Sequence, residues 1–313
     1  MTQPSQAGLA RSLLPIAVLT LVWGANWPIL KLGVTEMAPL TFRAYTLPFA
    51  GLGLLAIARF GGESIRVPRA LWPTVLILAL FNITGWNGLI LFGIQQMPAG
   101  RSAILAYTMP VWATIVSLFV LHEPLSRRKA IGLALGMAGM LVLVIDDLQE
   151  ISGSPFGVLM ILGAAVVWAI GTVLLRKLKP AIPPNTLAGW MMISGWVPLA
   201  IAAPMFDPQW LSHIPTLSPL AWFAIIYNIL FAGTIAHWAW FTLARTLPVA
   251  VSSLSSLPVP VVGVFAGIIV LGERPGPAEW IALVLVVCSL VAVLWPGAAA
   301  KAPPVTAPIA PDD

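Results

Sequence analysis

The chain alternates long runs of apolar residues with short polar stretches. A helix needs about 20 mostly apolar residues to cross a bilayer. Ten runs approach or exceed this length, at 13–32, 40–58, 71–92, 98–121, 130–145, 156–175, 187–205, 220–241, 248–271 and 279–295. The runs lack the alternation of barrel strands, and backbone groups in lipid must pair within their own segment. The pattern therefore predicts an all-α integral membrane protein with ten transmembrane helices.

Composition supports this class and excludes others. Hydrophobic residues make up 59% of the 313 residues and charged residues 9%, against about 25% charged in soluble domains. The single cysteine, Cys288, excludes an intrachain disulfide and a cysteine metal site. The net charge of +5 is spread between apolar runs, so no nucleic-acid partner is expected. No metal or cofactor is predicted, and the oligomeric state stays open.

The distribution of Lys and Arg predicts how the helices are oriented. If the N-terminus is cytoplasmic, 12 of the 16 bases lie on the cytoplasmic side, and the other four are Lys31, Arg43, Arg101 and Arg274. By the positive-inside rule both termini are expected in the cytoplasm. The Ala/Pro-rich tail at 297–313 is expected to be disordered.

An internal repeat divides the chain into two halves. An offset of 150 residues aligns Pro98 with Pro248, Pro110 with Pro260, and Glu123 with Glu273. We expect a cytoplasmic N-terminus at 1–12, five-helix repeats at 13–146 and 156–296, and an extracytoplasmic connector at 147–155. Because five is odd, the second repeat enters the membrane inverted. Inverted repeats are typical of secondary transporters, which bind substrate near the midplane between the halves.

Several segments resemble a known family. The first span reads WGANWPILK, the second begins APLTFRAY, and later segments read AYTMP, LHEPLSRRKAIGLALGMAG, SSLPVP and LGE. These resemble the drug/metabolite transporter superfamily in its ten-helix EamA-type branch, and within it the bacterial aromatic amino acid exporters. The resemblance implies an exporter in the bacterial inner membrane.

The repeat also separates candidate binding residues from residues of the shared fold. Asn82 and Trp86 lie at i and i+4 on one helical face, and their repeat partners Ala232 and Ala236 are small. Asn228 lies one turn earlier on that same stripe of the eighth span. An asymmetric wall of this kind suits an asymmetric substrate, although hydrogen bonds between packed helices remain the alternative for each asparagine.

Other polar and aromatic residues lie in mid-span. Asn26 lies between Trp23 and Trp27, and its repeat counterpart is Gly171. The complete candidate binding set is Trp23, Asn26, Asn82, Trp86, Tyr107, Trp168, Asn228 and His237. Structural packing is the competing interpretation for each, and the serines 252, 253, 255 and 256 are expected to bond their own helix.

Three prolines are candidate hinges. Pro110 lies near the middle of the fourth span, and Pro258 and Pro260 interrupt the repeat-related span. Proline removes a backbone donor and kinks a helix, so both halves are expected to bend at matching depth. Gly132 and Gly136 form a GxxxG motif that predicts close helix packing, within the subunit or between subunits.

The charged residues are expected to serve the fold. Glu123 and Glu273 each close a span before a turn, where a carboxylate can cap a helix or pair with nearby bases. Arg43 and Arg101 begin spans and are expected to reach the lipid headgroups. No Asp or Glu is predicted at mid-span, which argues against carboxylate-based ion coupling and favours facilitated transport.

The leading functional prediction is a transporter of small amphipathic metabolites, above all aromatic or other neutral amino acids, acting by alternating access. A transporter of the same fold for a drug, a nucleotide sugar or another metabolite is the second possibility, but a phosphate needs cationic groups that mid-span does not offer. A membrane enzyme is a distant third, because the three histidines are isolated and no hydrolase or zinc spacing occurs.

Overall fold

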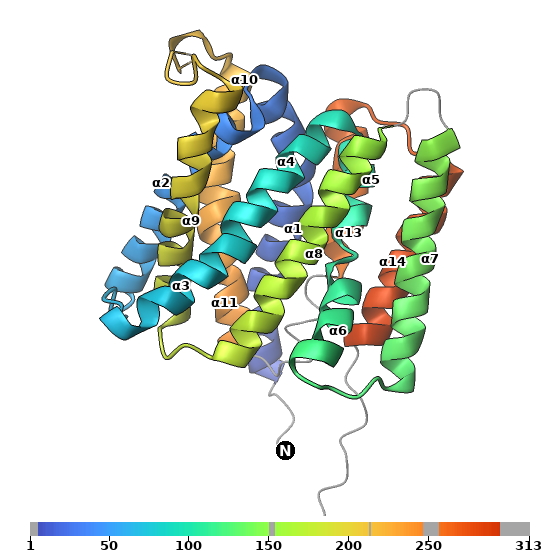
Figure 1. Cartoon of the computed structure of the whole chain (residues 1–313), viewed down its shortest axis with the longest axis horizontal. Coiled ribbons are helices and arrows are strands. Elements are labelled where there is room, and N and C mark those ends of the chain that lie inside the picture. Colours follow the sequence, from blue (N-terminus) through green and yellow to red (C-terminus); the bar gives the residue numbers. More distant parts are fainter. Residues whose placement is uncertain (1–5, 150–153, 213, 247–256, 295–313) are drawn as a thin grey trace, which may run out of the picture.

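The predicted all-α fold is confirmed. The computed structural model describes residues 6–149, 154–212, 214–246 and 257–294, and every regular element in these ranges is helical (Figure 1). Nine helical spans in them are long and apolar enough to cross a membrane, and the shorter helix Pro258–Leu271 represents the remaining predicted span. The tail at 297–313, the serines 252–256 and part of the predicted connector lie outside the described residues.

The first half contains two continuous and two interrupted spans before its last helix. Its elements are α1 Gln6–Glu36; α2 Pro39–Phe60; α3 Trp72–Ala79, a π-helical segment Leu80–Gly85 and α4 Trp86–Gln96; α5 Ala99–Ala106 and α6 Met109–Val120; and α7 Arg127–Gln149. A short 3₁₀ turn at Arg69–Leu71 precedes α3.

The second half follows the same plan. Its elements are α8 Pro155–Leu178; α9 Pro184–Phe206; α10 Pro219–Ile226, a π-helical segment Tyr227–Ile235 and α11 Ala236–Thr246; α13 Pro258–Leu271; and α14 Pro277–Leu294. A 3₁₀ turn at Ile214–Thr216 precedes α10. Helices exceed several predicted ranges: α1 begins at Gln6, and α7 extends to Gln149 into the predicted connector.

Proline sets the start of many of these helices. α2, α8, α9, α10 and α13 each begin with proline, whose fixed φ and missing N–H suit the first helical position. Ser154 and Ser218 add side-chain caps to α8 and α10, because their hydroxyls accept hydrogen bonds from Gly157 N and Ala221 N. Local sequence thus sets where these helices begin.

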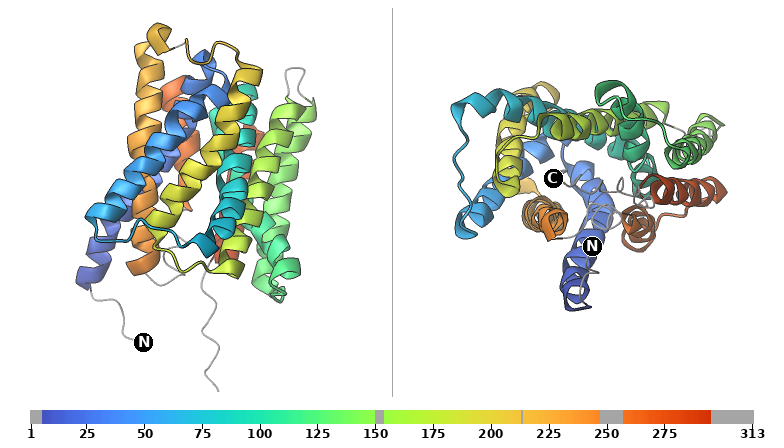
Figure 2. Two further views of the ribbon diagram at one scale, coloured as in Figure 1. Left: turned by 60° about the vertical axis from the view of Figure 1, so that its left-hand side comes forward. Right: turned by 90° about the horizontal axis from the view of Figure 1, so that it is seen from below.

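Each helix packs mainly against helices of the other half, and corresponding helices of the two halves make corresponding contacts. α1 contacts α13, and its counterpart α8 contacts α5 and α6; α2 pairs with α9, and α7 with α14. Figure 2 shows α7 and α14 side by side at one edge of the bundle. Gly132 and Gly136 face α14: a Cβ at Gly132 would lie 2.5 Å from Val293 Cγ2, and Ser289 Oγ donates a hydrogen bond to Gly132 O. The GxxxG contact therefore lies within the chain.

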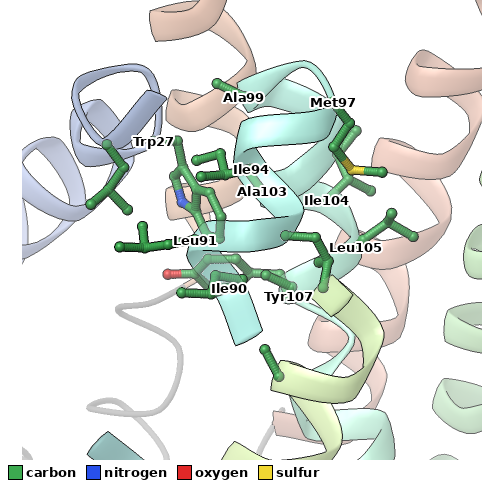
Figure 3. Packing of buried hydrophobic residues seen from close by; sticks show 14 of the residues in the cluster. Trp27, Ile90, Leu91, Ile94, Met97, Ala99, Ala103, Ile104, Leu105 and Tyr107 are labelled. Carbon is green, nitrogen blue, oxygen red and sulfur yellow. The ribbon is translucent and has the colours of Figure 1, made fainter. Parts of the chain in front are cut away.

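Apolar side chains lie both inside and outside the bundle. The largest buried cluster includes Trp27 from α1, Ile90 from α4, Ile104 from α5, and Tyr107, which directly follows α5 (Figure 3). Large apolar side chains such as Phe60, Ile269 and Met205 are exposed on the outside. Helices that are apolar on every side suit a lipid surround.

Candidate functional site

A cavity lies between the two halves of the bundle. It encloses about 900 Å³ of atom-free space, including its mouth. The first four spans of the first half and the first three spans of the second half contribute to its wall. All eight residues of the predicted binding set line it: Trp23, Asn26, Asn82, Trp86, Tyr107, Trp168, Asn228 and His237. Residues far apart in the sequence are thus brought to one site.

Aromatic rings form much of the wall. The centroids of Trp86 and Trp168 are 5.0 Å apart, so the two halves meet ring against ring. Trp23 approaches His237 edge-on at 5.2 Å. Aromatic pairs at these separations are favourable and leave ring faces and edges for an apolar ligand.

Trp27 also lines the cavity, with its ring centroid 6.5 Å from that of Tyr107. Figure 3 shows both rings beside Ile90 in the buried cluster. The sequence marks Trp27 only as a neighbour of Asn26. Its spacing of four residues from Trp23, which predicts a shared helical face, is the signal that could have identified it.

Two asparagines are held by their own helices. Asn82 Nδ2 donates to Leu78 O and Asn228 Nδ2 donates to Ala224 O, both at 3.1 Å. These bonds leave each amide oxygen to accept from another donor. For Asn228 that donor lies on a neighbouring helix, because Arg43 Nη1 on α2 donates to its Oδ1 at 3.1 Å, so the alternative interpretation of a bond between packed helices applies to Asn228.

π-helical segments in the third and eighth spans shape this part of the wall. Asn82 and Asn228 both lie in these segments. Within the second segment the carbonyl of Ala232 accepts hydrogen bonds from Trp23 Nε1 at 3.1 Å and His237 Nδ1 at 2.9 Å. Because a carbonyl only accepts, neutral His237 carries its proton on Nδ1 and has Nε2 as an acceptor. π-helical turns are frequent at functional sites, and the sequence did not predict these.

Asn26 offers an unused acceptor. Its Oδ1 is buried and has no hydrogen-bond partner in the part of the chain that the structure describes. Because a buried amide oxygen without a partner costs free energy, a ligand donor would stabilise it.

Arg43 contradicts the expectation that it reaches the lipid headgroups. Its residue surface is 7% exposed, and the side chain lines the cavity. Nη1 donates to Asn228 Oδ1 at 3.1 Å, whereas Nε has no partner among the described residues. The expectation that the cavity region lacks a cation is therefore also wrong. Sequence reasoning missed Arg43 because its place near a helix start is typical of headgroup-binding bases.

Arg101 is also buried, and the headgroup expectation is wrong for it too. It is 4% exposed and forms ion pairs with Asp146 at 2.6 Å, Glu279 at 2.5 Å and Asp147 at 3.4 Å. These contacts join α5 to α7 and α14. Arg101 lies outside the cavity wall and serves the packing of the bundle.

The repeat-matched glutamates lie outside the cavity wall. Glu273 accepts hydrogen bonds from Ala99 N at 2.6 Å and Gly100 N at 2.9 Å, and thereby caps α5 of the other half. Glu123 pairs with Lys129 at 2.8 Å and Arg176 at 2.5 Å. Both contacts are structural, and Glu273 caps a distant helix instead of the next one.

The three prolines mark helix starts. Pro110 is the second residue of α6, after a break in the helix at Tyr107 and Thr108. Pro258 and Pro260 lie in the first turn of α13. The fourth span is thus broken instead of kinked, and the hinge role of the prolines stays a prediction.

Comparison with known families decides the class of this bundle. The model of the EamA-like transporter family matches residues 10–145 and again 155–295, one match for each half. The chain belongs to the EamA-like transporter family. It is accordingly a multi-pass membrane protein of a transporter family, and the two matches agree with the two repeats predicted from the sequence.

Individual relatives of this EamA-like transporter cover nearly its whole length. It is 30% identical to the uncharacterized inner membrane transporter YedA of Escherichia coli K12, over 96% of this chain and 98% of YedA. It is 26% identical to the uncharacterized transporter YoaV of Bacillus subtilis, over 85% and 90%. A protein of E. coli K12 named "probable amino-acid metabolite efflux pump" is 25% identical, over 87% and 91%.

A solved crystal structure shares the fold. It is 21% identical to this EamA-like transporter, with a TM-score of 0.63, and the match covers 91% of this chain and 97% of that chain.

Proposed function

We propose that this EamA-like transporter exports small amphipathic metabolites, with aromatic and other neutral amino acids as the leading class. The cavity between the two halves carries this proposal. Its aromatic wall suits an apolar body, while Asn26 and Asn82 offer hydrogen bonds to a polar end. The E. coli relative named as an amino-acid metabolite efflux pump supports the same class.

Transport follows alternating access between the inverted repeats. No Asp or Glu is among the described residues that line the cavity, which favours facilitated movement down the substrate gradient over coupling through a carboxylate. The relative named as an inner membrane transporter supports a location in the bacterial inner membrane, and the distribution of Lys and Arg supports cytoplasmic positions for both termini.

Counterflow in proteoliposomes tests the proposal. Vesicles loaded with unlabelled L-Phe, L-Trp, L-Thr or L-Met are diluted into the same labelled amino acid without an ion gradient. We expect transient accumulation of labelled aromatic amino acids, absent from empty liposomes and reduced in Trp86→Ala. Exchange of a nucleotide sugar with no exchange of any amino acid would reject the proposal.

A further inference from the structure

The cavity contains a cation, Arg43, for which the described residues supply no carboxylate counter-ion. Arg43, on α2, is nearly fully buried, and no Asp or Glu forms an ion pair with it or lines the cavity within the described ranges. A buried charge without a counter-ion is unfavourable in water-soluble proteins and in membranes. Its presence therefore calls for a functional partner.

Arg101 shows how this bundle treats a structural arginine. Its guanidinium is equally buried but meets three carboxylates, from Asp146, Asp147 and Glu279. Arg43 instead meets the neutral amide of Asn228. The two arginines have similar exposure and similar places near helix starts, so the missing carboxylate is specific to the cavity.

The neighbours of Arg43 orient its guanidinium without neutralising it. Asn228 is held by its own bond to Ala224 O, and its oxygen accepts from Arg43 Nη1. Nε has no hydrogen-bond partner in the ranges that the structure covers. A guanidinium presents its donors as a planar fork that matches the two oxygens of a carboxylate, so the free edge of Arg43 suits one such group.

We propose that Arg43 binds the carboxylate of the transported molecule, so that the substrates are aromatic carboxylates with or without an α-amino group. This inference rests on the proposed function and narrows it. Neutral acceptors line the described wall, among them Asn26 Oδ1, Asn82 Oδ1 and His237 Nε2, but no carboxylate does, so the α-amino group gains no ion pair there and contributes less than the carboxylate. On this inference, aromatic amines and amides that lack a carboxylate are not substrates.

A panel of matched ligands tests the assignment on the full-length wild-type protein. Binding in nanodiscs is followed through the fluorescence of the tryptophans that line the cavity, and counterflow is measured in parallel. We expect L-Phe and 3-phenylpropionate to bind at least about tenfold more tightly than 3-phenylpropionamide and phenethylamine, because hydrogen bonds to a charged group contribute about 1.5–3 kcal/mol. Equal binding of acid, amide and amine overturns the inference, as does tighter binding of phenyl phosphate than of the carboxylates.

Variants separate binding by Arg43 from a structural role. We expect Arg43→Lys to keep the preference for acids at lower affinity, and Arg43→Gln to bind acid and amide equally. Arg59 lies on the same helix and is exposed in its last turn, so Arg59→Gln is the matched control and keeps the preference. A purely structural role predicts that Arg43→Gln weakens all ligands alike, which overturns the inference. If Arg43→Gln does not fold, the wild-type panel decides alone.

The two readouts distinguish this inference from the proposed function. Binding of acids that depends on Arg43, without exchange of any ligand, supports the carboxylate site and contradicts transport. Exchange of amino acids with no preference for the carboxylate supports transport and contradicts the role of Arg43.

Discussion

Arg43 and Arg101 lie near helix starts in the sequence, and local pattern assigns both to the lipid headgroups. The two arginines differ in their partners. Arg101 pairs with acids that lie 45, 46 and 178 residues away in the sequence, whereas Arg43 bonds to an asparagine 185 residues away. Sequence spacing carries no information about such contacts without the fold. The predicted neutral pathway thus becomes a cavity whose described wall carries a positive charge at Arg43.

Gly171 on α8 provides a test of the cavity wall at the residue scale. A Cβ there would lie 2.5 Å from the amide of Asn82, so this amide must shift from its place in the cavity wall. We expect Gly171→Ala to weaken L-Phe binding about tenfold, since one displaced polar contact corresponds to about 1–3 kcal/mol. The tryptophan fluorescence titration measures this.

Gly163 supplies the control, because a Cβ at that position on the same helix would meet only Leu89 Cδ1, at 3.4 Å. We expect Gly163→Ala to bind as wild type. Unchanged binding in Gly171→Ala would place the ligand elsewhere.

At the scale of elements, a carboxylate of the second half caps a helix of the first half. The Glu273 carboxylate accepts two backbone N–H groups of α5, whereas Glu123 makes partly exposed ion pairs. A lost cap costs about 1 kcal/mol, and an exposed ion pair contributes less. We therefore expect Glu273→Gln to lower the stability more than Glu123→Gln in thermal unfolding of the detergent-solubilised protein at pH 7. The reverse order would contradict the capping role.

The effect of Glu123→Gln depends on pH. The hydrogen bond from Lys129, supported by Arg176, holds the pKa of the Glu123 carboxyl below its usual range. A lowered folded-state pKa stabilises the protein above the unfolded value of about 4.5, and this contribution is lost as the pH falls through the folded-state pKa. The stability difference between wild type and Glu123→Gln is thus expected to shrink below about pH 4.5.

The presence of each membrane-spanning helix was predictable because each span is a long apolar run. Many helix starts are marked by proline or serine. The break at Tyr107 and Thr108 follows from Pro110, which the sequence identified as a disruption. The π-helical segments at Leu80–Gly85 and Tyr227–Ile235 carry no comparable signal. A contact from a distant helix, the bond from Trp23 Nε1 to Ala232 O, reaches the second of these segments, and such a contact is not visible in local sequence.

At the scale of the whole molecule, the repeat explains why eight predicted residues meet. Corresponding helices make corresponding contacts: α1 packs on α13, and its counterpart α8 packs on α5 and α6. The first spans of both halves therefore lie around one cavity. The sequence identified polar and aromatic residues that differ between the halves, and the fold gathers them. Their role in binding follows from the proposed function and awaits the ligand measurements.

Alternating access at this cavity is the central claim, and cysteine accessibility tests it most directly. Asn82→Cys is prepared in a Cys288→Ala background, and a membrane-impermeant thiol reagent is applied from each side in turn; Ala164→Cys, at a fully buried site on α8, is the control. We predict modification of Asn82→Cys from both sides, slowed by L-Phe, with the control unmodified. Modification from one side only, or from neither, would contradict the account.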